Sequence, residues 1–432
     1  MTMRWKKKMT EQRGFKVKLL PTIEQENKFW QFAGARRFAY NWALGMQMKS
    51  YSETGKNIDK NELCKMFVQM KCTDSEKAWL KDISCDVPKQ AIKDLCEAYS
   101  RYFKKMKEYR YVPFTKSKII KSQRNNKPLT NYDRNGHPKF KKKLNCDEGF
   151  HQDCMHVRFT DNCVYIAKIG LVKIAKDDIF PQGLSGKDFK IYNAKVKTDG
   201  EHWYFVAALD VPKEQLNKVE DIAKSEPVGI DLGIKDLAIL SNGTKFKNIN
   251  KTRKVKKLEK RRKRLQRKVS KKYERNKKSD NYVKTSNSIR LQKKILAITH
   301  KLTNIRTNYR HQTTTAIVKR NPIFIAMEDL NVKGMMKNKH LSKSISEQGW
   351  GYFRTYLKYK CESNNIPLVF VDRWYPSSKT CSCCGNIYKE LKLSDRVYIC
   401  PKCGAKLDRD INAAINIRNQ GQSIYEKSII QA

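Results

Sequence analysis

Four cysteines in the C-terminal part of the sequence have the spacing of a metal site. Cys381 and Cys384 flank two residues and precede a glycine, and Cys400 and Cys403 repeat this arrangement after 15 intervening residues. Each pair suits a tight turn that presents two thiolates, and the glycine allows the turn backbone to close. The four cysteines therefore predict one structural Zn²⁺ held by four thiolates.

Three acidic residues have positions suited to binding harder cations. Asp231 and Glu328 each end an apolar run, and Asp410 opens a segment of helical periodicity. Cleavage of a polynucleotide with two Mg²⁺ ions uses carboxylates at strand ends, because Mg²⁺ prefers oxygen ligands. Each acid also has a structural interpretation. Asp231 could cap a turn, Glu328 could simply be solvated after a strand, and Asp410 could cap its helix, a task that Asp408 could share.

The charge of the chain favours a nucleic-acid partner. Its 432 residues include 91 Lys and Arg against 43 Asp and Glu, a net charge of +48. Self-repulsion of this size destabilises a compact protein unless a polyanion neutralises it. A membrane is a less suitable partner, because the sequence has neither a long apolar run nor a signal peptide. We therefore expect a cytoplasmic protein without a membrane partner.

The most basic segment, 251–278, carries 17 Lys and Arg against two acids. So few acids leave little i,i+4 pairing, which makes a merely solvated helix face less attractive. Apolar residues at heptad spacing in 291–305, with a weaker matching series in 255–269, predict a helical hairpin over 251–318. Its basic face is a candidate wall for a nucleic-acid channel. The candidate contacts are Lys257, Arg261, Arg264 and Lys268.

The N-terminal part predicts a strand followed by a helix. Apolar residues alternate over 15–19, and Thr22 with Gln25 forms a capping box that starts the helix. Four residues of this helix are weak candidates for contact with duplex DNA, because core or solubility roles explain them equally well. They are Arg36, Arg37, Tyr40 and Asn41.

Periodicity and composition predict the remaining elements. These are a helix over 87–108, a long loop over 111–150, strands of a small antiparallel barrel or sheet over 157–211, a strand ending at 230, a β-hairpin turning at 242–243, a strand over 323–327, a loop over 333–349, a helix over 350–364, a strand over 368–371, a ribbon over 376–405 and a final helix from 411.

Several motifs, taken in order along the chain, closely resemble transposon-encoded TnpB proteins, to which the compact type V CRISPR effector nucleases are related. The resemblance is strong over 226–420 and weaker before it, where ARRFAYN and HPKFKKK carry it. The loop at 111–150 is long for the family, so no contacts are transferred through it. The motifs are GIDLGIKDLAIL, MEDLNVKGMMKNKHLSKSISEQGWG, YPSSKTCSCCG, CPKCG and DRDINAAINI.

The resemblance implies a multidomain α+β fold. It consists of an N-terminal wedge β-barrel with an inserted helical recognition domain, then an RNase H-like RuvC α/β domain that carries a helical hairpin and a zinc ribbon. The implied boundaries are 1–20 and 110–224 for the wedge barrel, 21–109 for the recognition domain, 225–375 and 406–432 for the RuvC domain, and 376–405 for the zinc ribbon.

The resemblance also implies an activity. Family members are RNA-guided DNA endonucleases, so a guide RNA and target double-stranded DNA with a short flanking motif are the expected partners. The family's catalytic triad falls on Asp231, Glu328 and Asp410, which would hold two Mg²⁺ ions. Arg396, just before the second cysteine pair, could reach a phosphate at the cleavage site, or be an ordinary surface charge.

Two other functions use the same features. A DNA transposase or recombinase would use the same three acids but act without RNA, and a regulator would bind nucleic acid without cutting it. The zinc ribbon and the charge are common to all three. The residues also leave open whether a guide comes from a transposon end or a CRISPR array, which flanking motif is read, the cleavage pattern and the number of copies on one RNA.

Overall fold

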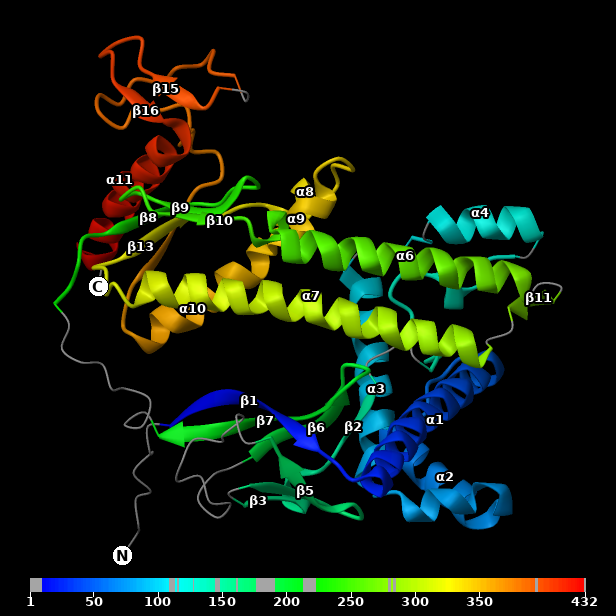
Figure 1. Cartoon of the computed structure of the whole chain (residues 1–432). Coiled ribbons are helices and arrows are strands. Elements are labelled where there is room, and N and C mark those ends of the chain that lie inside the picture. The colour runs from blue at the N-terminus through cyan, green and yellow to red at the C-terminus, as the bar shows by residue number, and fades with distance from the viewer. Residues whose placement is uncertain are drawn as a thin grey trace, which may run out of the picture. The chain divides into compact units, whose positions relative to one another are not determined.

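The chain folds into two compact units, Met1–Leu216 and Asn217–Ala432, and we describe each by itself. The structure is a computed structural model (Figure 1). It describes residues 10–108, 113–114, 116–126, 128–143, 148–160, 162–175, 191–212, 223–278, 281–282, 285–392 and 395–430. Among the described helices, none combines the length and apolar character needed to cross a membrane.

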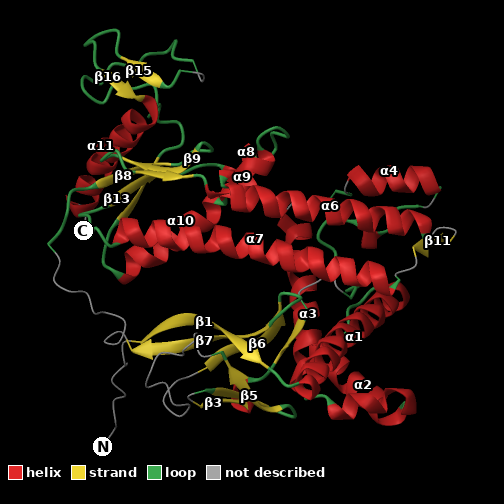
Figure 2. Cartoon of the chain, viewed as in Figure 1, coloured by secondary structure: helices red, strands yellow, loops and turns green. Residues whose placement is uncertain are grey.

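The first unit combines helices with an antiparallel sheet (Figure 2). Its helices are α1 (Ile23–Thr54), α2 (Lys60–Thr73), α3 (Asp86–Glu108) and α4 (Lys116–Asn125), with 3₁₀ turns at Ser75–Asp82, Asn131–Asp133 and Cys154–His156. Its strands are β1 (Thr10–Leu20), β2 (Gly149–His151), β3 (Val157–Thr160), β4 (Cys163–Ile166), β5 (Gly170–Ile174), β6 (Ile191–Thr198) and β7 (Trp203–Pro212).

Helix α1 begins where the sequence predicts. The Thr22 hydroxyl accepts a hydrogen bond from the Gln25 backbone, and the Gln25 side chain accepts one from Thr22 in return. The helix ends at Gly55, whose φ of +68° is costly for residues with a Cβ. The predicted strand at 15–19 lies within β1, and the predicted helix at 87–108 is α3.

The strands of the first unit form one sheet in the order β2-β6-β7-β1-β5-β4-β3. The predicted closed barrel is not formed by the described strands, because the edge strands β2 and β3 do not pair with each other. Both edge strands are short, three and four residues, whereas β1 pairs with β7 from Thr10 to Leu19. The expectation of a barrel or sheet at 157–211 is therefore met by a sheet.

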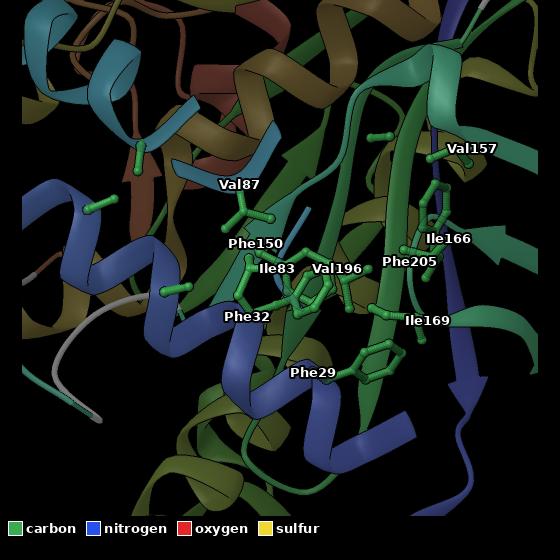
Figure 3. Close-up of a cluster of buried hydrophobic side chains, with 14 of the residues drawn as sticks. Phe29, Phe32, Ile83, Val87, Phe150, Val157, Ile166, Ile169, Val196 and Phe205 are labelled. Carbon is green, nitrogen blue, oxygen red and sulfur yellow. The ribbon is translucent and has the colours of Figure 1, made fainter. Parts of the chain in front are cut away.

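The core of this unit lies between the sheet and the helices. Apolar side chains from α1, from α3 and from the inner face of the sheet meet in one cluster (Figure 3). Phe29 and Phe32 of α1 contact Phe150 of β2 at ring-centroid distances of 5.9 and 5.0 Å. Burial of these large rings is the main force that packs α1 onto the sheet.

The segment 111–150 is not the single loop that its polar composition predicts. It contains α4, a 3₁₀ turn and the start of β2, although 109–112, 115, 127 and 144–147 lie outside the described residues. Local contacts organise this part of the chain: Lys118 of α4 pairs with Asp133 at 2.7 Å. Composition alone missed this order because the segment offers few apolar residues.

The described part of the second unit combines a five-stranded mixed sheet and two two-stranded sheets with helices. Its strands are β8 (Val228–Asp231), β9 (Asp236–Leu240), β10 (Lys245–Lys247), β11 (Lys277–Lys278), β12 (Asn281–Tyr282), β13 (Ile325–Glu328), β14 (Leu368–Val371), β15 (Val397–Ile399) and β16 (Lys406–Asp408). Its helices are α6 (Arg253–Arg275), α7 (Ser286–Val318), α8 (Val332–Met335), α9 (Ser342–Gln348), α10 (Trp350–Ser363) and α11 (Arg409–Ile430), with a 3₁₀ turn at Ile249–Lys251.

Helices α8 and α9 occupy 333–349, where a loop was predicted. The Asn331 side chain accepts a hydrogen bond from the Gly334 backbone and starts α8. Buried Ile345 and Gln348 anchor α9 in the unit. Short helices fixed by tertiary contacts leave too little periodicity in the sequence to be recognised.

The central sheet has the order β10-β9-β8-β13-β14, in which β8, β13 and β14 are parallel. The predicted hairpin is β9–β10, and Gly243 at its turn has a φ of +85°. Helix α11 packs along β8 and β13 (Figure 1).

Two glycines allow α11 to approach the sheet closely. A Cβ at Gly229 of β8 would lie 2.1 Å from the Ala414 carbonyl oxygen of α11, and a Cβ at Gly421 of α11 would lie 2.4 Å from that of Ala326 in β13. Neither position has room for a side chain. These contacts determine how closely α11 packs on the sheet and which face of the helix it turns toward the strands.

The predicted helical hairpin is the pair α6 and α7. Buried Val255 of α6 meets Ile298 and Leu302 of α7, at the seam that the heptad spacing predicts. Glu259 pairs with Arg306 of α7 at 3.1 Å. The seam therefore buries Val255 and covers part of Leu258 and Leu265.

Candidate metal centres

The fold brings the three acids identified in the sequence to one edge of the central sheet. Asp231 is the last residue of β8 and Glu328 the last residue of β13. The strands are parallel neighbours in which Ile230 registers with Met327, so both acids follow at the carboxyl ends. Asp410 lies in the first turn of α11, which packs on the same strands.

The negative charges of the three acids are close enough to change the pKa of Asp231. Burial, together with the negative charges of Glu328 and Asp410, raises the pKa of Asp231 to about 8. Burial also raises the pKa of Glu328, against a hydrogen bond from Ser377 that lowers it. Gathering carboxylates away from water is unfavourable without cations, so this arrangement suits a site that binds them.

Asp408 and Asp410 have different roles in the first turn of α11. The Asp408 side chain accepts hydrogen bonds from the backbone N–H groups of Asp410 and Ile411, and it pairs with Lys245 at 2.6 Å. Asp408 therefore caps the helix. Within the described part of the chain, no hydrogen bond or ion pair to the Asp410 carboxylate is found, which leaves it available to a ligand.

The acid cluster fits Mg²⁺ by its chemistry. All three side chains offer carboxylate oxygens, the ligands that Mg²⁺ prefers. Their oxygens are more widely spread than those of a single compact site, since the cysteines are the only described group of ligand atoms within 4.8 Å of one another. Asp231, Glu328 and Asp410 would together hold a pair of Mg²⁺ ions rather than a single ion.

A cavity of about 300 Å³ adjoins Glu328 and is lined by three cationic side chains. These are Lys333, Arg354 and Arg373. Both arginines pair with Asp329, at 2.5 and 2.8 Å, which holds their guanidinium groups in place. Sequence analysis did not identify these residues, because the arginines come from α10 and from the turn after β14.

The four cysteines form the tetrathiolate cluster that their spacing predicts. Their sulfur atoms all lie within 4.8 Å of one another. Gly385 and Gly404 close the two turns, with φ of +72° and +73°. Cys383 is exposed and stands outside the cluster.

The thiols of the cluster influence one another's ionisation. The Cys403 backbone N–H points at the sulfur of Cys400 and lowers the pKa of that thiol to about 6, whereas the neighbouring thiols raise the pKa of Cys403 to about 12 against a backbone hydrogen bond from Ala405. A thiolate at neutral pH is the form that binds Zn²⁺. The donor set of four sulfurs in two turns fits a structural zinc ion.

The four candidate DNA contacts on α1 are engaged within their own unit. Arg36 pairs with Asp94 at 3.2 Å, and Arg37 with the buried Glu148 at 3.0 Å. The Asn41 amide and the Lys141 backbone exchange two hydrogen bonds. Tyr40 is buried, and burial raises the pKa of its phenol to about 12. These contacts favour the structural alternative for these residues.

The candidate contacts on α6 have the opposite environment. Lys257, Arg261, Arg264 and Lys268 are all exposed, and their spacing of 4, 3 and 4 residues places them along one face of the helix. Arg396 is exposed beside β15, and its carbonyl accepts a hydrogen bond from the Arg409 backbone. These five side chains are accessible to a partner.

Three family models match the chain in succession. A helix-turn-helix domain of the OrfB/IS605 group covers 9–56, the OrfB/IS605 "Probable transposase" model covers 210–339, and the Cas12f1-like TNB domain covers 350–417. The second match includes Asp231 and Glu328, and the third includes Asp410 and all four clustered cysteines. The chain is therefore similar to OrfB/TnpB proteins over most of its length. The resemblance seen in the sequence motifs is thereby confirmed.

Similar proteins cover almost the whole of this chain. A "Putative RNA-guided DNA endonuclease" of Streptomyces pristinaespiralis is 27% identical, over 95% of this chain and 89% of that protein. The "Putative RNA-guided DNA endonuclease InsQ" of Escherichia coli K12 is 28% identical, over 96% and 94%. A Cas12f1–sgRNA–target DNA complex gives 16% identity and a TM-score of 0.32 over 95% of this chain and 99% of that chain. The assignment rests on the sequence matches.

Proposed function

We propose that this protein is an RNA-guided DNA endonuclease with a single RuvC-type site. The observation that carries the proposal is the convergence of Asp231, Glu328 and Asp410 from two parallel strands and one helix. The names of the two full-length relatives support the same activity. In this proposal the second unit contains an RNase H-like nuclease domain with its zinc ribbon, and the first contains the recognition domain and all of the wedge domain up to Leu216.

The three acids would hold a pair of Mg²⁺ ions. Such ions activate the attacking water and stabilise the leaving oxygen of the scissile phosphodiester. Asp231 and Glu328 would supply ligand oxygens from the ends of β8 and β13, and Asp410 would supply one from the first turn of α11. The cationic side chains in the cavity beside Glu328 would bind phosphates of the DNA strand and align it with the acids. No protein nucleophile is needed.

The exposed stripe on α6 would contact the phosphates of the guide–target duplex. A protein that holds a heteroduplex by its backbone needs cations at helical spacing and little base readout. We expect substitution of Lys257, Arg261, Arg264 and Lys268 by Gln to weaken RNA binding and to make it less dependent on salt. A binding constant and salt slope equal to those of the unsubstituted protein would contradict this role.

A DNA transposase or recombinase is the second candidate. The matched family model carries the description "Probable transposase", and a 25% identical protein of Paramecium bursaria Chlorella virus 1 is named "Putative transposase A625R". An enzyme of that kind would act on element ends without a guide. A regulator that binds without cutting is the third candidate, and the presence of all three acids argues against it.

The deciding experiment is cleavage of a plasmid that carries a guide-matched target and a randomised flanking sequence. Protein co-expressed with RNA transcribed from the sequence that flanks its gene is compared with protein that lacks RNA and with the Asp231→Ala variant. We expect cutting that requires both RNA and Mg²⁺ and disappears in the variant. Cutting without RNA would favour the transposase, and RNA binding without cutting would favour the regulator.

A further inference from the structure

A single hydroxyl group links the acid cluster to the polypeptide that enters the zinc ribbon. The Ser377 Oγ donates a hydrogen bond to Oε1 of Glu328. Ser377 lies four residues before Cys381 and is 6% exposed. Because the bond engages one carboxylate oxygen, it restricts rotation of the group and orients the other oxygen.

Two buried side-chain amides of α11 hold residues 377–382, here called the serine segment, in place. Asn416 Nδ2 donates to the carbonyl oxygens of Ser377 at 2.8 Å and Thr380 at 2.6 Å. Asn412 Nδ2 also donates to Thr380, at 2.7 Å, and its Oδ1 accepts from the Ser382 backbone at 3.0 Å. Asn412 is 0% exposed and Asn416 is 3% exposed. Buried amides that hydrogen-bond to several backbone groups of one segment fix its position.

The hydrogen bonds form a continuous connection between the two metal centres. From Glu328 it passes through Ser377 and Asn416 to Thr380, and then through Asn412 to Ser382, the residue after the first cysteine ligand. The same helix carries Asp410 in its first turn. The segment before the first cysteine knuckle, the turn that carries Cys381 and Cys384, is thus hydrogen-bonded both to Glu328 and to α11, the helix that supplies Asp410.

We propose that Ser377 is a positioning residue for the divalent-cation site. Supported by Asn412 and Asn416, it connects the first cysteine knuckle to the Glu328 carboxylate, so that an ordered ribbon strengthens Mg²⁺ binding by the acids. This role rests on the proposed nuclease function. Ser377 does not itself contact substrate; it acts through Glu328.

Binding of Mn²⁺ as a probe for Mg²⁺ tests the proposal without relying on cleavage. Mn²⁺ is titrated into the full chain and followed by electron paramagnetic resonance, and Asp231→Ala identifies the ions that depend on the acid cluster. We expect Ser377→Ala to weaken this binding about 10- to 100-fold, as is usual when a residue that orients a metal ligand is lost. Ser377→Thr keeps the hydroxyl and should recover the affinity to within about threefold.

Ser363→Ala is the matched control, because it removes a hydroxyl that donates to the Tyr359 carbonyl within α10 of the same unit. It should leave Mn²⁺ affinity unchanged. Zinc content and melting temperature are measured for every variant, so that misfolding is recognised. Wild-type affinity in Ser377→Ala, an equal loss in Ser363→Ala, or failure of Ser377→Thr to restore binding would each overturn the proposal.

Asn416→Ala provides a second route if Ser377→Ala misfolds. It should also weaken Mn²⁺ binding, and the double variant should bind no more weakly than Ser377→Ala, since both substitutions break one connection. Independent, additive losses would contradict a shared pathway. A protein that binds Mn²⁺ at the acids but never cuts DNA would overturn the proposed function while leaving the effect of Ser377 measurable.

Discussion

The zinc ribbon and the acid cluster are two metal centres built in opposite ways. The four cysteines lie within 23 residues of sequence, 381–403, and two similar turns bring them together. The three acids span 180 residues, 231–410, and come from two strands and a helix. The ribbon can be recognised from spacing alone, whereas the acid cluster exists only when the sheet and α11 have packed together.

The two centres also differ in where the pKa shifts of their ligands come from. In the ribbon the shifts have opposite signs: a backbone N–H lowers the pKa of the Cys400 thiol to about 6, whereas neighbouring thiols raise the pKa of Cys403 to about 12 against a backbone hydrogen bond from Ala405. In the acid cluster, burial and the neighbouring acids raise the pKa of Asp231 to about 8. Each centre gathers anions that repel one another, and a bound cation would stabilise the charged form of both.

Loss of a zinc ligand should have the largest effect. We expect Cys384→Ser to reduce zinc content from one ion per chain towards zero and to unfold the ribbon, because structural zinc sites contribute about 10 kcal/mol. Elemental analysis and hydrogen exchange over 380–408 measure both changes. Cys383→Ser is the control, since Cys383 is exposed and outside the cluster. If Cys383→Ser loses zinc as well, the assignment of the ligands is wrong.

The two aspartates at the start of α11 should separate catalysis from stability. We expect Asp410→Ala to slow cleavage at least about a thousandfold, equal to about 4 kcal/mol of transition-state stabilisation, without lowering the melting temperature. Asp408→Ala should instead lose a helix cap worth about 1 kcal/mol and continue to cut. Single-turnover cleavage and thermal unfolding distinguish them, and a reversed result would exchange the two roles.

Gly229→Ala should damage the acid cluster without touching an acid. The added Cβ would lie 2.1 Å from the Ala414 carbonyl, so α11 must shift, at a cost of about 3 kcal/mol in the free energy of unfolding. Cleavage should fall as well, because Asp410 moves with the helix, while zinc content stays at one. Gly45→Ala is the control, since no atom lies within 4 Å of its Cβ position. Normal cleavage in Gly229→Ala would show that the acids tolerate this displacement.

The raised pKa of Asp231 predicts a pH dependence of stability. Without divalent ions the folded protein binds a proton that the unfolded chain releases above pH 4, so stability falls as pH rises from about 4 to about 8. Asp231→Asn should remove this decline, which is at most about 1.4 kcal/mol per pH unit. Chemical denaturation at pH 5 and pH 8 measures it. Equal slopes in both proteins would show that Asp231 is solvated.

Features that depend on residues close together in the sequence can be predicted from it, whereas contacts between residues far apart along the chain cannot. The ends of β8 and β13, the capped start of α1 and the α6–α7 seam all follow from patterns within one element, and they were predicted. By contrast, Arg36 and Arg37 find their partners Asp94 and Glu148 far along the chain. No local pattern shows that such residues are engaged inside the protein rather than with DNA.

The surroundings of the acid cluster were missed for the same reason. Ser377 and Asn416 appear within family motifs, but their hydrogen bonds to Glu328 and to the serine segment depend on the packing of α11. The need for glycine at 229 becomes visible only from the closeness of helix and strand. Their positions at the ends of apolar runs and at the start of a helical segment identified the acids as candidates, and only the family resemblance and the fold bring them together.

The position of α11 in the chain bears on when the acid cluster forms during synthesis. Asp231 and Glu328 leave the ribosome well before Asp410, and the sheet edge they occupy stays open until α11 emerges and docks over Gly229. The first cysteine turn is itself hydrogen-bonded to this helix through Asn412. The three carboxylates therefore cannot assemble until α11 has been synthesised and has docked, which makes the last helix of the unit the one that completes the site proposed here.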